Sequence, residues 1–354
     1  MIEPFQVAGV TIEEVDLRAL SDNQIAELNA YSNTLNAEAM PEDPPRPVEL
    51  TAASVRNIPT FVVVREFWAR DAAGALAATA SAGWTETEDN RHLVESGLNV
   101  RSDLRRRGIG TALLRVVADA TEEAGRTLLL GGTTTRVPAG EGFAQTLGAE
   151  AGLRQHINHL TLADVDRAMV DRWVAEGPGR AEGYSLEKID GPYPEDMLEE
   201  IVEVHKIMNT APRDDLDMED WVLTVEQMRE FEKSMLATGS QRWSILVRHD
   251  ESGTLIGNTE TSWNPKGNPK IMWQMGTAVR PDHRGHALGK WMKAEMVARI
   301  LDERAGVTEI RTGNADSNDA MLGINVALGF KPYFATIAWQ LQLEKVRAYL
   351  GAKV

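Results

Sequence analysis

The feature that most constrains the fold of this chain is an internal duplication. Residues 92–125 and 272–306 both read as a strand, a short polar turn, a glycine-containing loop and a long amphipathic helix. Each copy continues into a short apolar run and then into a segment that closes on Leu-Gly, at Gly148 and at Gly329. Because the elements follow in the same order without forced gaps, we predict two tandem copies of one α/β domain.

The length of 354 residues is also typical of two domains. Antiparallel strands are predicted upstream of each loop, over residues 60–66, 75–85, 242–248 and 254–263, and helices before them over 21–36 and 194–209. Residues 162–175 read as helical, and the string EGPGRAEG is expected to end that helix. We therefore expect an N-terminal domain over 1–163, a linker over 164–183 and a C-terminal domain over 184–354.

Composition narrows the function classes. The chain has no cysteine, which removes thiolate metal sites and a cysteine nucleophile, and no other metal site is expected. A net charge of −16 has the wrong sign for a nucleic-acid-binding surface. No run of about 18 apolar residues is present, and the acidic N-terminus lacks a secretory pattern. The expectation is a cytoplasmic protein, monomer or homodimer, that binds neither membranes nor nucleic acid.

The two glycine-containing loops are RRRGIG (residues 105–110) and RGHALG (284–289). A strand that feeds such a loop into a helix forms an anion site, because the first helical N–H groups have no partners within the helix. Neither loop is a Walker A motif or a dinucleotide-binding fingerprint. One such loop alone could equally be a structural turn, whereas two copies in the same setting favour a phosphate-binding role.

Both loops resemble the R/Q-x-x-G-x-G/A signature of the GNAT N-acetyltransferase superfamily. The first loop matches at Arg105, Gly108 and Gly110, and the second at Arg284 and Gly289, with Ala287 in place of the middle glycine. Asn318 and the string Leu328-Gly329-Phe330 resemble a further segment of that family. The resemblance implies an α/β (α+β) fold of two GNAT-like domains, each a splayed mixed sheet flanked by helices, with acetyl-CoA in the V-shaped gap.

The resemblance also implies which residues contact acetyl-CoA. They are Val100, Arg105, Arg107, Gly108, Gly110 and Thr111 in the first half, and Val279, Arg284, Gly285, His286, Ala287, Gly289, Lys290 and Asn318 in the second. Two departures from the family matter. Its usual tyrosine acid is replaced by Ala144 and Asn325, and the first half has a Gly/Pro-broken segment where the second is expected to have a helix.

Amine acetylation needs a base, because the acceptor is protonated at neutral pH, and an acid for the departing thiolate. The candidate bases are Glu260 and, in the first half, Glu95, whose equivalent in the second half is expected to be Gln274. Tyr333 is the candidate acid in the second half. The alternatives are an exposed strand position for either glutamate and a packed aromatic ring for the tyrosine.

The acid-rich stretch over residues 190–232 suggests a cationic acceptor, with Asp214 and Asp215 as its contacts. The predicted function is acetyl-CoA-dependent N-acetyl transfer to a primary amine of a small cationic molecule, with the C-terminal domain catalytic. Two alternatives stay open. One is an acyl-CoA-binding sensor without activity, and the other is a protein N-acetyltransferase.

Overall fold

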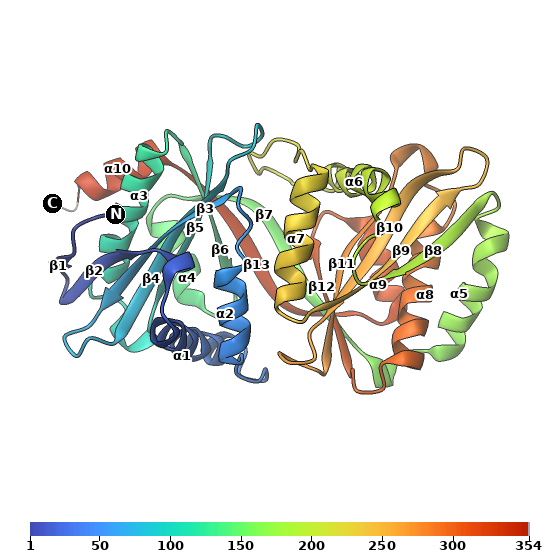
Figure 1. Cartoon of the computed structure of the whole chain (residues 1–354), viewed down its shortest axis with the longest axis horizontal. Helices are drawn as coiled ribbons and strands as arrows, with labels where there is room; N and C mark the ends of the chain where they lie inside the picture. Colours follow the sequence, from blue (N-terminus) through green and yellow to red (C-terminus); the bar gives the residue numbers. More distant parts are fainter. Residues whose placement is uncertain (353–354) are drawn as a thin grey trace. The chain divides into compact units, whose positions relative to one another are not determined.

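The computed structural model describes residues 1–352, which form two compact units (Figure 1). The first unit contains Met1–Arg154, Asp214–Asp220 and the chain from Thr336 onward. The second contains Gln155–Arg213 and Trp221–Ala335. Both units have the mixed α/β architecture that the duplication predicts.

The first unit is a mixed sheet between two helical layers. Its strand order is β1-β2-β3-β4-β5-β6-β13. The strands are β1 (Phe5–Val7), β2 (Val10–Val15), β3 (Val62–Arg70), β4 (Leu76–Thr85), β5 (Leu93–Val100), β6 (Leu128–Thr134) and β13 (Lys331–Gln342), and the helices are α1 (Asp22–Ala39), α2 (Val48–Arg56), α3 (Ile109–Glu123), α4 (Pro138–Thr146) and α10 (Leu343–Gly351).

The second unit repeats this plan with the strand order β7-β12-β11-β10-β9-β8. The strands are β7 (Glu150–Thr161), β8 (Tyr184–Asp190), β9 (Gln241–His249), β10 (Thr254–Trp263), β11 (Ile271–Val279) and β12 (Glu309–Ala315), and the helices are α5 (Arg167–Arg180), α6 (Leu198–Lys206), α7 (Val225–Ala237), α8 (Leu288–Glu303) and α9 (Asp319–Leu328).

Successive side chains of a strand point to opposite faces of its sheet, and in both units apolar side chains cover both faces. In β3, Phe67 packs in the core that α3 and α10 cover, whereas its neighbour Trp68 packs in the core under α1 and α2. In β9, Ile245 and Leu246 divide in the same way between the α5–α8 face and the α6–α7 face. Strands buried on both faces explain why the predicted strands read as nearly continuous apolar runs.

The last strand and helix of each sequence half complete the unit of the other half. Residues 155–161 of β7 pair antiparallel with β12, and α5 packs against α8. Residues 336–342 of β13 pair antiparallel with β6, and α10 packs against α3. The compact units are therefore discontinuous in sequence, and the boundaries at residues 163 and 184 stay predictions about the sequence repeat.

Two helices differ from the sequence-based expectation. The predicted linker is helix α5, which continues through Pro178 to Arg180 and buries Val170 and Trp173 in the core of the second unit. The segment of the first half that we expected to be broken by Gly and Pro is helix α4. Pro138 occupies its first turn, where a missing N–H costs nothing and the fixed φ favours the helix.

In each unit, two parallel strands of the sheet part from one another. β5 pairs with β6 only from Leu93 to Glu95, although β5 continues to Val100. β11 pairs with β12 only from Ile271 to Trp273, although β11 continues to Val279. The ends of β5 and β11 that do not pair with β6 and β12 lead directly into the two glycine-containing loops. Each loop therefore lies beside an opening in its sheet.

Candidate active site

The two loops follow the same backbone path. Arg106 and Gly285 occupy equivalent places and have positive φ angles of 63° and 91°. Gly108 and Ala287, which precede helices α3 and α8, are both in the left-handed region, with φ of 87° and 58°. The second loop therefore keeps the geometry of the first although alanine replaces glycine, at a conformational cost of about 1 kcal/mol.

The signature arginines tie each loop to the strand before it. Arg105 Nε donates to the carbonyl of Val100 at 3.0 Å, and Arg284 Nε donates to the carbonyl of Val279 at 2.9 Å. Their guanidinium groups differ beyond this shared contact. Arg105 forms a bidentate ion pair with Glu38, with both distances 2.6 Å, so its charge is compensated within the protein.

In the second loop, the corresponding contact of Arg284 is to the neutral hydroxyl of Thr210, at 2.6 Å. Its charge is therefore better available to an anion than the charge of Arg105. Lys290, in the first turn of α8, holds its ammonium 3.8 Å from the ring centroid of Trp173, and His286 lies beside the ring of Tyr184. In the first loop, Arg107 donates to the backbone carbonyl of Asp103, in the turn before the loop, at 3.0 Å.

The helix starts fit a diphosphate group. Neither α3 nor α8 has a side-chain cap, so the N–H groups of their first turns are not satisfied by a capping residue. These turns contain Gly110 with Thr111 and Gly289 with Lys290. The helix dipole adds positive potential at the same place. The predicted loop residues of each half thus gather around a helix start suited to the pyrophosphate of CoA.

Asn318 is placed elsewhere than at the loop. It is the N-cap of α9, and its side-chain oxygen accepts from the N–H of Met321 at 3.3 Å. This bond gives Asn318 a structural role, and its contact with acetyl-CoA stays a prediction.

A β-bulge distinguishes the second unit from the first. In the β10–β11 pair, Thr259 lies opposite Thr277 and Thr261 opposite Gln274, so Met275 and Gly276 together oppose Glu260. The equivalent β4–β5 pair keeps a continuous register. A classic bulge leaves one residue out of the ladder and bends the strand, and bulges are common beside active sites.

The bulge also corrects one expected equivalence. Glu95 lies opposite Leu130 of β6, at the third and last paired position of β5. The corresponding position of β11 is Trp273, which lies opposite Arg311 of β12. Gln274 is therefore not the equivalent of Glu95, because β11 has one extra residue between this point and the loop.

Each unit contains a buried glutamate opposite a serine at the same place in its sheet. Glu260 of β10 lies opposite Ser244 of β9, and Glu66 of β3 lies opposite Ser81 of β4. When strand positions are counted from the two loops, Glu260 corresponds to Ser81 and Ser244 corresponds to Glu66. The glutamate and the serine have therefore exchanged strands between the two units. Burial raises the pKa of both carboxyls, in each case to about 8. The serine opposite Glu260 donates to its Oε1 at 2.9 Å.

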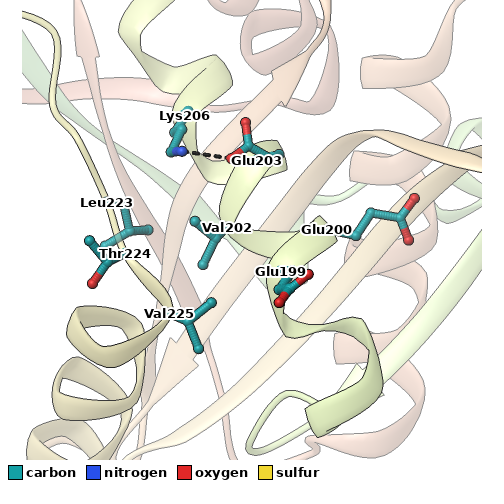
Figure 2. Close-up of a pocket in the computed structure, with 8 residues that line it drawn as sticks. All are labelled: Glu199, Glu200, Val202, Glu203, Lys206, Leu223, Thr224 and Val225. Atoms are coloured by element: carbon teal, nitrogen blue, oxygen red, sulfur yellow. Dashed lines mark hydrogen bonds and ion pairs between the residues drawn. The ribbon is translucent and has the colours of Figure 1, made fainter.

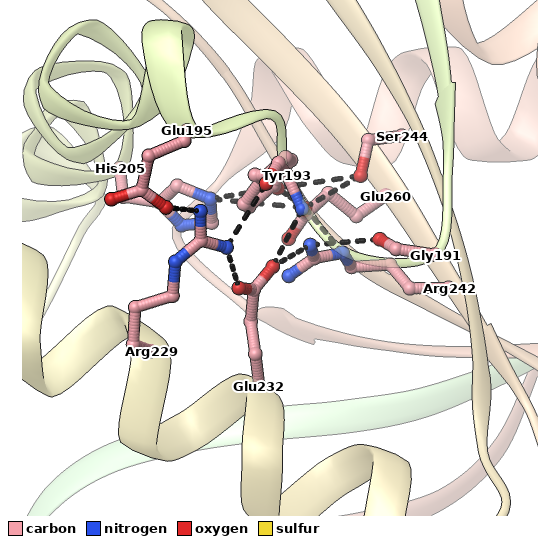
Figure 3. Close-up of polar contacts among 9 residues, drawn as sticks. All are labelled: Gly191, Tyr193, Glu195, His205, Arg229, Glu232, Arg242, Ser244 and Glu260. Atoms are coloured by element: carbon pink, nitrogen blue, oxygen red, sulfur yellow. Dashed lines mark hydrogen bonds and ion pairs between the residues drawn. The ribbon is translucent and has the colours of Figure 1, made fainter.

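Glu260 is enclosed by a polar cluster that the sequence did not predict (Figure 3). Its Oε1 accepts from the hydroxyl of Tyr193, which lies 3.0 Å from Nε2 of His205. Tyr193 and His205 come from the β8–α6 loop and from α6, more than 50 residues from Glu260 in sequence. The only local signal was a Tyr and a His within the acid-rich stretch that begins at residue 190.

Tyr333, the candidate acid, lies at the start of β13, in the part of this strand up to Ala335 that belongs to the second unit. Its ring stacks on His159, with centroids 4.8 Å apart and planes at 15°, and the guanidinium carbon of Arg311 lies 5.1 Å from its centroid. The ring is half-buried. This arrangement holds the ring firmly, and the acid role stays a prediction.

Asp214 and Asp215 belong to a segment that packs in the first unit. The backbone N–H of Asp215 donates to the carbonyl of Gly152 at 2.9 Å, and the carbonyl of Asp215 accepts from Gln340 at 2.9 Å. Both partners lie on strands that enter the first unit. We had expected this segment to belong to the second domain. The contact of Asp214 and Asp215 with the acceptor stays a prediction.

Sequence reasoning also missed a buried lysine. Lys293 of α8 is almost completely buried, and its Nζ lies 2.5 Å from Oδ1 of Asn325. Nδ2 of Asn325 in turn donates to Oδ1 of Asn314 on β12 at 2.7 Å. Burial lowers the pKa of Lys293 to about 7. Its place in a helix with apolar neighbours is the signal that could have identified it.

A surface pocket of about 450 Å³ lies between α6 and the start of α7 (Figure 2). Glu199, Glu200, Glu203 and Lys206 line it, and Lys206 pairs with Glu203 at 2.6 Å. Glu200 also accepts from the backbone N–H of Leu255 on β10, at 2.6 Å, and His205 of the same helix turns to Glu260. None of the predicted site residues lines this pocket.

Within residues 1–352, no group of three or more His, Asp and Glu side chains is arranged to hold a metal ion. No helix of this part of the chain combines the length and apolarity needed to cross a membrane.

Comparison with known proteins identifies the class. Residues 28–148 match the family model described as the acetyltransferase (GNAT) family. The match identifies a GNAT acetyltransferase domain in the first half of the chain, and GNAT proteins are acyltransferases that use acyl-CoA. None of the curated proteins compared with the chain matches it.

Solved structures extend the likeness to both halves. The chain is similar to a tandem GNAT protein from the clavulanic acid biosynthesis pathway, with 25% identity and a TM-score of 0.76 over 94% of this chain and 98% of that one. A GCN5-related N-acetyltransferase from Sphaerobacter thermophilus shares 13% identity, with a TM-score of 0.64 over 94% and 96% of the two chains. N-myristoyltransferase of Saccharomyces cerevisiae shares 15% identity, with a TM-score of 0.57 over 96% and 84%. The tandem arrangement of two GNAT-like domains is therefore shared along nearly the whole chain.

Proposed function

We propose that this protein transfers an acetyl group from acetyl-CoA to a primary amine of a small cationic molecule, and that the second unit carries out the reaction. The observation that carries this proposal is the β11 bulge opposite Glu260, which the first unit lacks. It brings an irregular backbone, a buried carboxyl and the opening between β11 and β12 to one place.

Binding of acetyl-CoA in the second unit is assigned to the loop and the helix it opens. The N–H groups at the start of α8, together with Arg284 and Lys290, would hold the pyrophosphate, and the unpaired end of β11 would border the pantetheine arm. The bound cofactor supplies an acetyl group activated as a thioester. A backbone N–H at the bulge would donate to the acetyl carbonyl oxygen and stabilise its developing charge.

Glu260 is the proposed base. It takes a proton from the acceptor nitrogen as the new N–C bond forms and the C–S bond breaks, and Tyr333 is the proposed donor to the sulfur. A pKa of about 8 is close to working pH, where a general base is most effective. Because Glu260 must be deprotonated, we expect activity to rise as pH increases toward about 8.

The net charge of −16 supports a cationic acceptor, since a negative surface raises the encounter rate with cations. The first experiment is release of free CoA from acetyl-CoA in the presence of a panel of primary amines that differ in charge. Activity with cationic amines that falls as salt increases supports the assignment. Equal activity with anionic amines, insensitive to salt, would exclude it.

The base assignment has a matched control in the first unit. Glu260→Gln should reduce kcat by about 100-fold or more, the usual contribution of general base catalysis. Glu66→Gln changes an equally buried carboxyl at the equivalent position and should leave kcat near that of the unmodified protein. If both variants lose activity equally while still folded, Glu260 is not distinguished as the base.

A further inference from the structure

Tyr193 is the centre of the polar cluster in Figure 3. Its hydroxyl donates to Oε1 of Glu260 and lies 3.0 Å from Nε2 of His205 and 3.3 Å from Oγ of Ser244. The residue is only 2% exposed. A hydroxyl is both a donor and an acceptor, so it connects the carboxyl to the imidazole through two hydrogen bonds.

The charges around Glu260 are balanced without it. Arg242 Nε lies 3.9 Å from Oε1 of Glu260, but the same guanidinium group donates to Glu232. Arg229 also pairs with Glu232, and its Nη2 lies 2.5 Å from the carboxylate of Glu195. Glu232 further accepts from the backbone N–H of Tyr193 at 2.8 Å. The positive charge nearest to Glu260 therefore has its own carboxylate, which leaves Glu260 free to change its protonation state.

His205 is the member of the chain Glu260–Tyr193–His205 that is nearest to solvent. Its side chain is 15% exposed, compared with 11% for Glu260. Burial, together with the charge of Arg242, lowers the pKa of His205 to about 4. The imidazole is therefore neutral at physiological pH, and it returns any proton that it receives to water.

We propose that Tyr193 and His205 form the path by which the proton that Glu260 takes from the acceptor amine leaves the site. This inference rests on the proposed role of Glu260 as the base. It assigns a part in catalysis to Tyr193 and His205, two residues that lie outside the glycine-containing loops and outside the strands of the sheet.

The transfer is balanced at each step. While Glu260 is a carboxylate, the Tyr193 hydroxyl donates to it. Once Glu260 is protonated and Nε2 of His205 carries no proton, the Tyr193 hydroxyl turns to Nε2. Glu260 then gives its proton to the oxygen of Tyr193 while the Tyr193 hydroxyl proton passes to Nε2 of His205. The resulting imidazolium of His205 loses a proton to water, and proton exchange of the ring with water restores Nε2 as an acceptor. Glu260 is then a carboxylate again and is ready for the next acceptor. No oxidant, reductant or metal takes part.

Tyr193→Phe removes the connecting hydroxyl and keeps the ring, which packs under the guanidinium of Arg242 at 3.5 Å from its centroid. CoA release with the best amine of the panel should show kcat about 10-fold lower or more, with little change in the amine KM, because a proton-transfer step has been removed. Glu66→Gln serves as the folded control, and thermal unfolding checks the integrity of each variant.

His205→Ala tests the path from its outer end. Imidazole added to the buffer should restore kcat of this variant in a saturable way, since it can enter the space of the lost side chain. Imidazole should not restore Tyr193→Phe or Glu260→Gln, in which the path is broken further inside. A merely structural role of His205 would not give this pattern of rescue.

The outcomes separate this inference from the proposed function. If Glu260→Gln is inactive and Tyr193→Phe keeps its full kcat, the path is excluded and the base remains. If Glu260→Gln keeps its kcat, the base assignment itself fails. If folded His205→Ala is as active as the unmodified protein, or is inactive and insensitive to imidazole, His205 does not carry the proton.

Discussion

Lys293 offers a prediction whose size follows from its burial. The side chain is enclosed between α8, α9 and β12, and burial lowers its pKa from 10.5 to about 7. This difference corresponds to on the order of 5 kcal/mol of unfavourable free energy for the charged form in the folded state. Because the folded pKa is below the unfolded one, the unfolded chain binds more protons between pH 7 and 10.5, and stability rises with pH across that window.

Lys293→Met removes the ionisable group and keeps most of the volume. The free energy of unfolding of this variant should therefore rise less steeply between pH 7 and about 10 than that of the unmodified protein. Loss of the donor to Asn325 costs about 1–3 kcal/mol, so at pH 6 the variant should be more stable by about 2–4 kcal/mol. The assay is unfolding of the second unit by heat or urea at a series of pH values.

Lys188→Met is the matched control, because Lys188 is half-exposed and pairs with Glu295 at 2.9 Å. It should change stability by less than about 1 kcal/mol and leave the pH dependence as it is. If Lys293→Met is less stable at pH 6 and keeps the full pH dependence, the pKa of Lys293 is not lowered in the folded protein and the reasoning is wrong.

Three further predictions concern the fold. Gly177→Ala should destabilise the second unit by about 1–3 kcal/mol in thermal unfolding, because a Cβ there would lie 2.3 Å from the indole of Trp291. Gly108→Ala should cost only about 1 kcal/mol, since the position is left-handed but its new Cβ would meet only Ala8 at 3.6 Å. Residues 1–163 expressed alone lack the strand that pairs with β6 and the helix on α3, so circular dichroism should show no cooperative unfolding.

The sequence predicted the parts of this structure that depend on local pattern. The strand over Thr254–Trp263 was predicted with the observed bounds, and the two loops form the same left-handed turns before their helices. The helix predicted over residues 21–36 is α1, which begins with a capping box between Ser21 and Gln24. These features depend on alternation, glycine positions and side-chain caps, all of which lie within a few residues.

The parts that were missed depend on contacts between distant residues. Nothing near β7 or β13 indicates which sheet each strand joins, so their exchange was not predicted. Pro178 was expected to end a helix, but the packing of Gly177 against Trp291 holds α5 in place. The cluster around Glu260 combines side chains from four separate elements, and no sequence spacing connects them.

The most direct test of the account is a comparison of the two loops in one assay. Gly289→Glu and Gly110→Glu each place a carboxylate at the start of a phosphate-binding helix, and a Cβ at either position meets only ordinary contacts of 3.5 Å or more, so both variants should fold. CoA release from acetyl-CoA with the best amine is then measured. We expect Gly289→Glu to abolish transfer and Gly110→Glu to leave most of it. Loss of activity in Gly110→Glu with full activity in Gly289→Glu would place catalysis in the first unit and contradict the account.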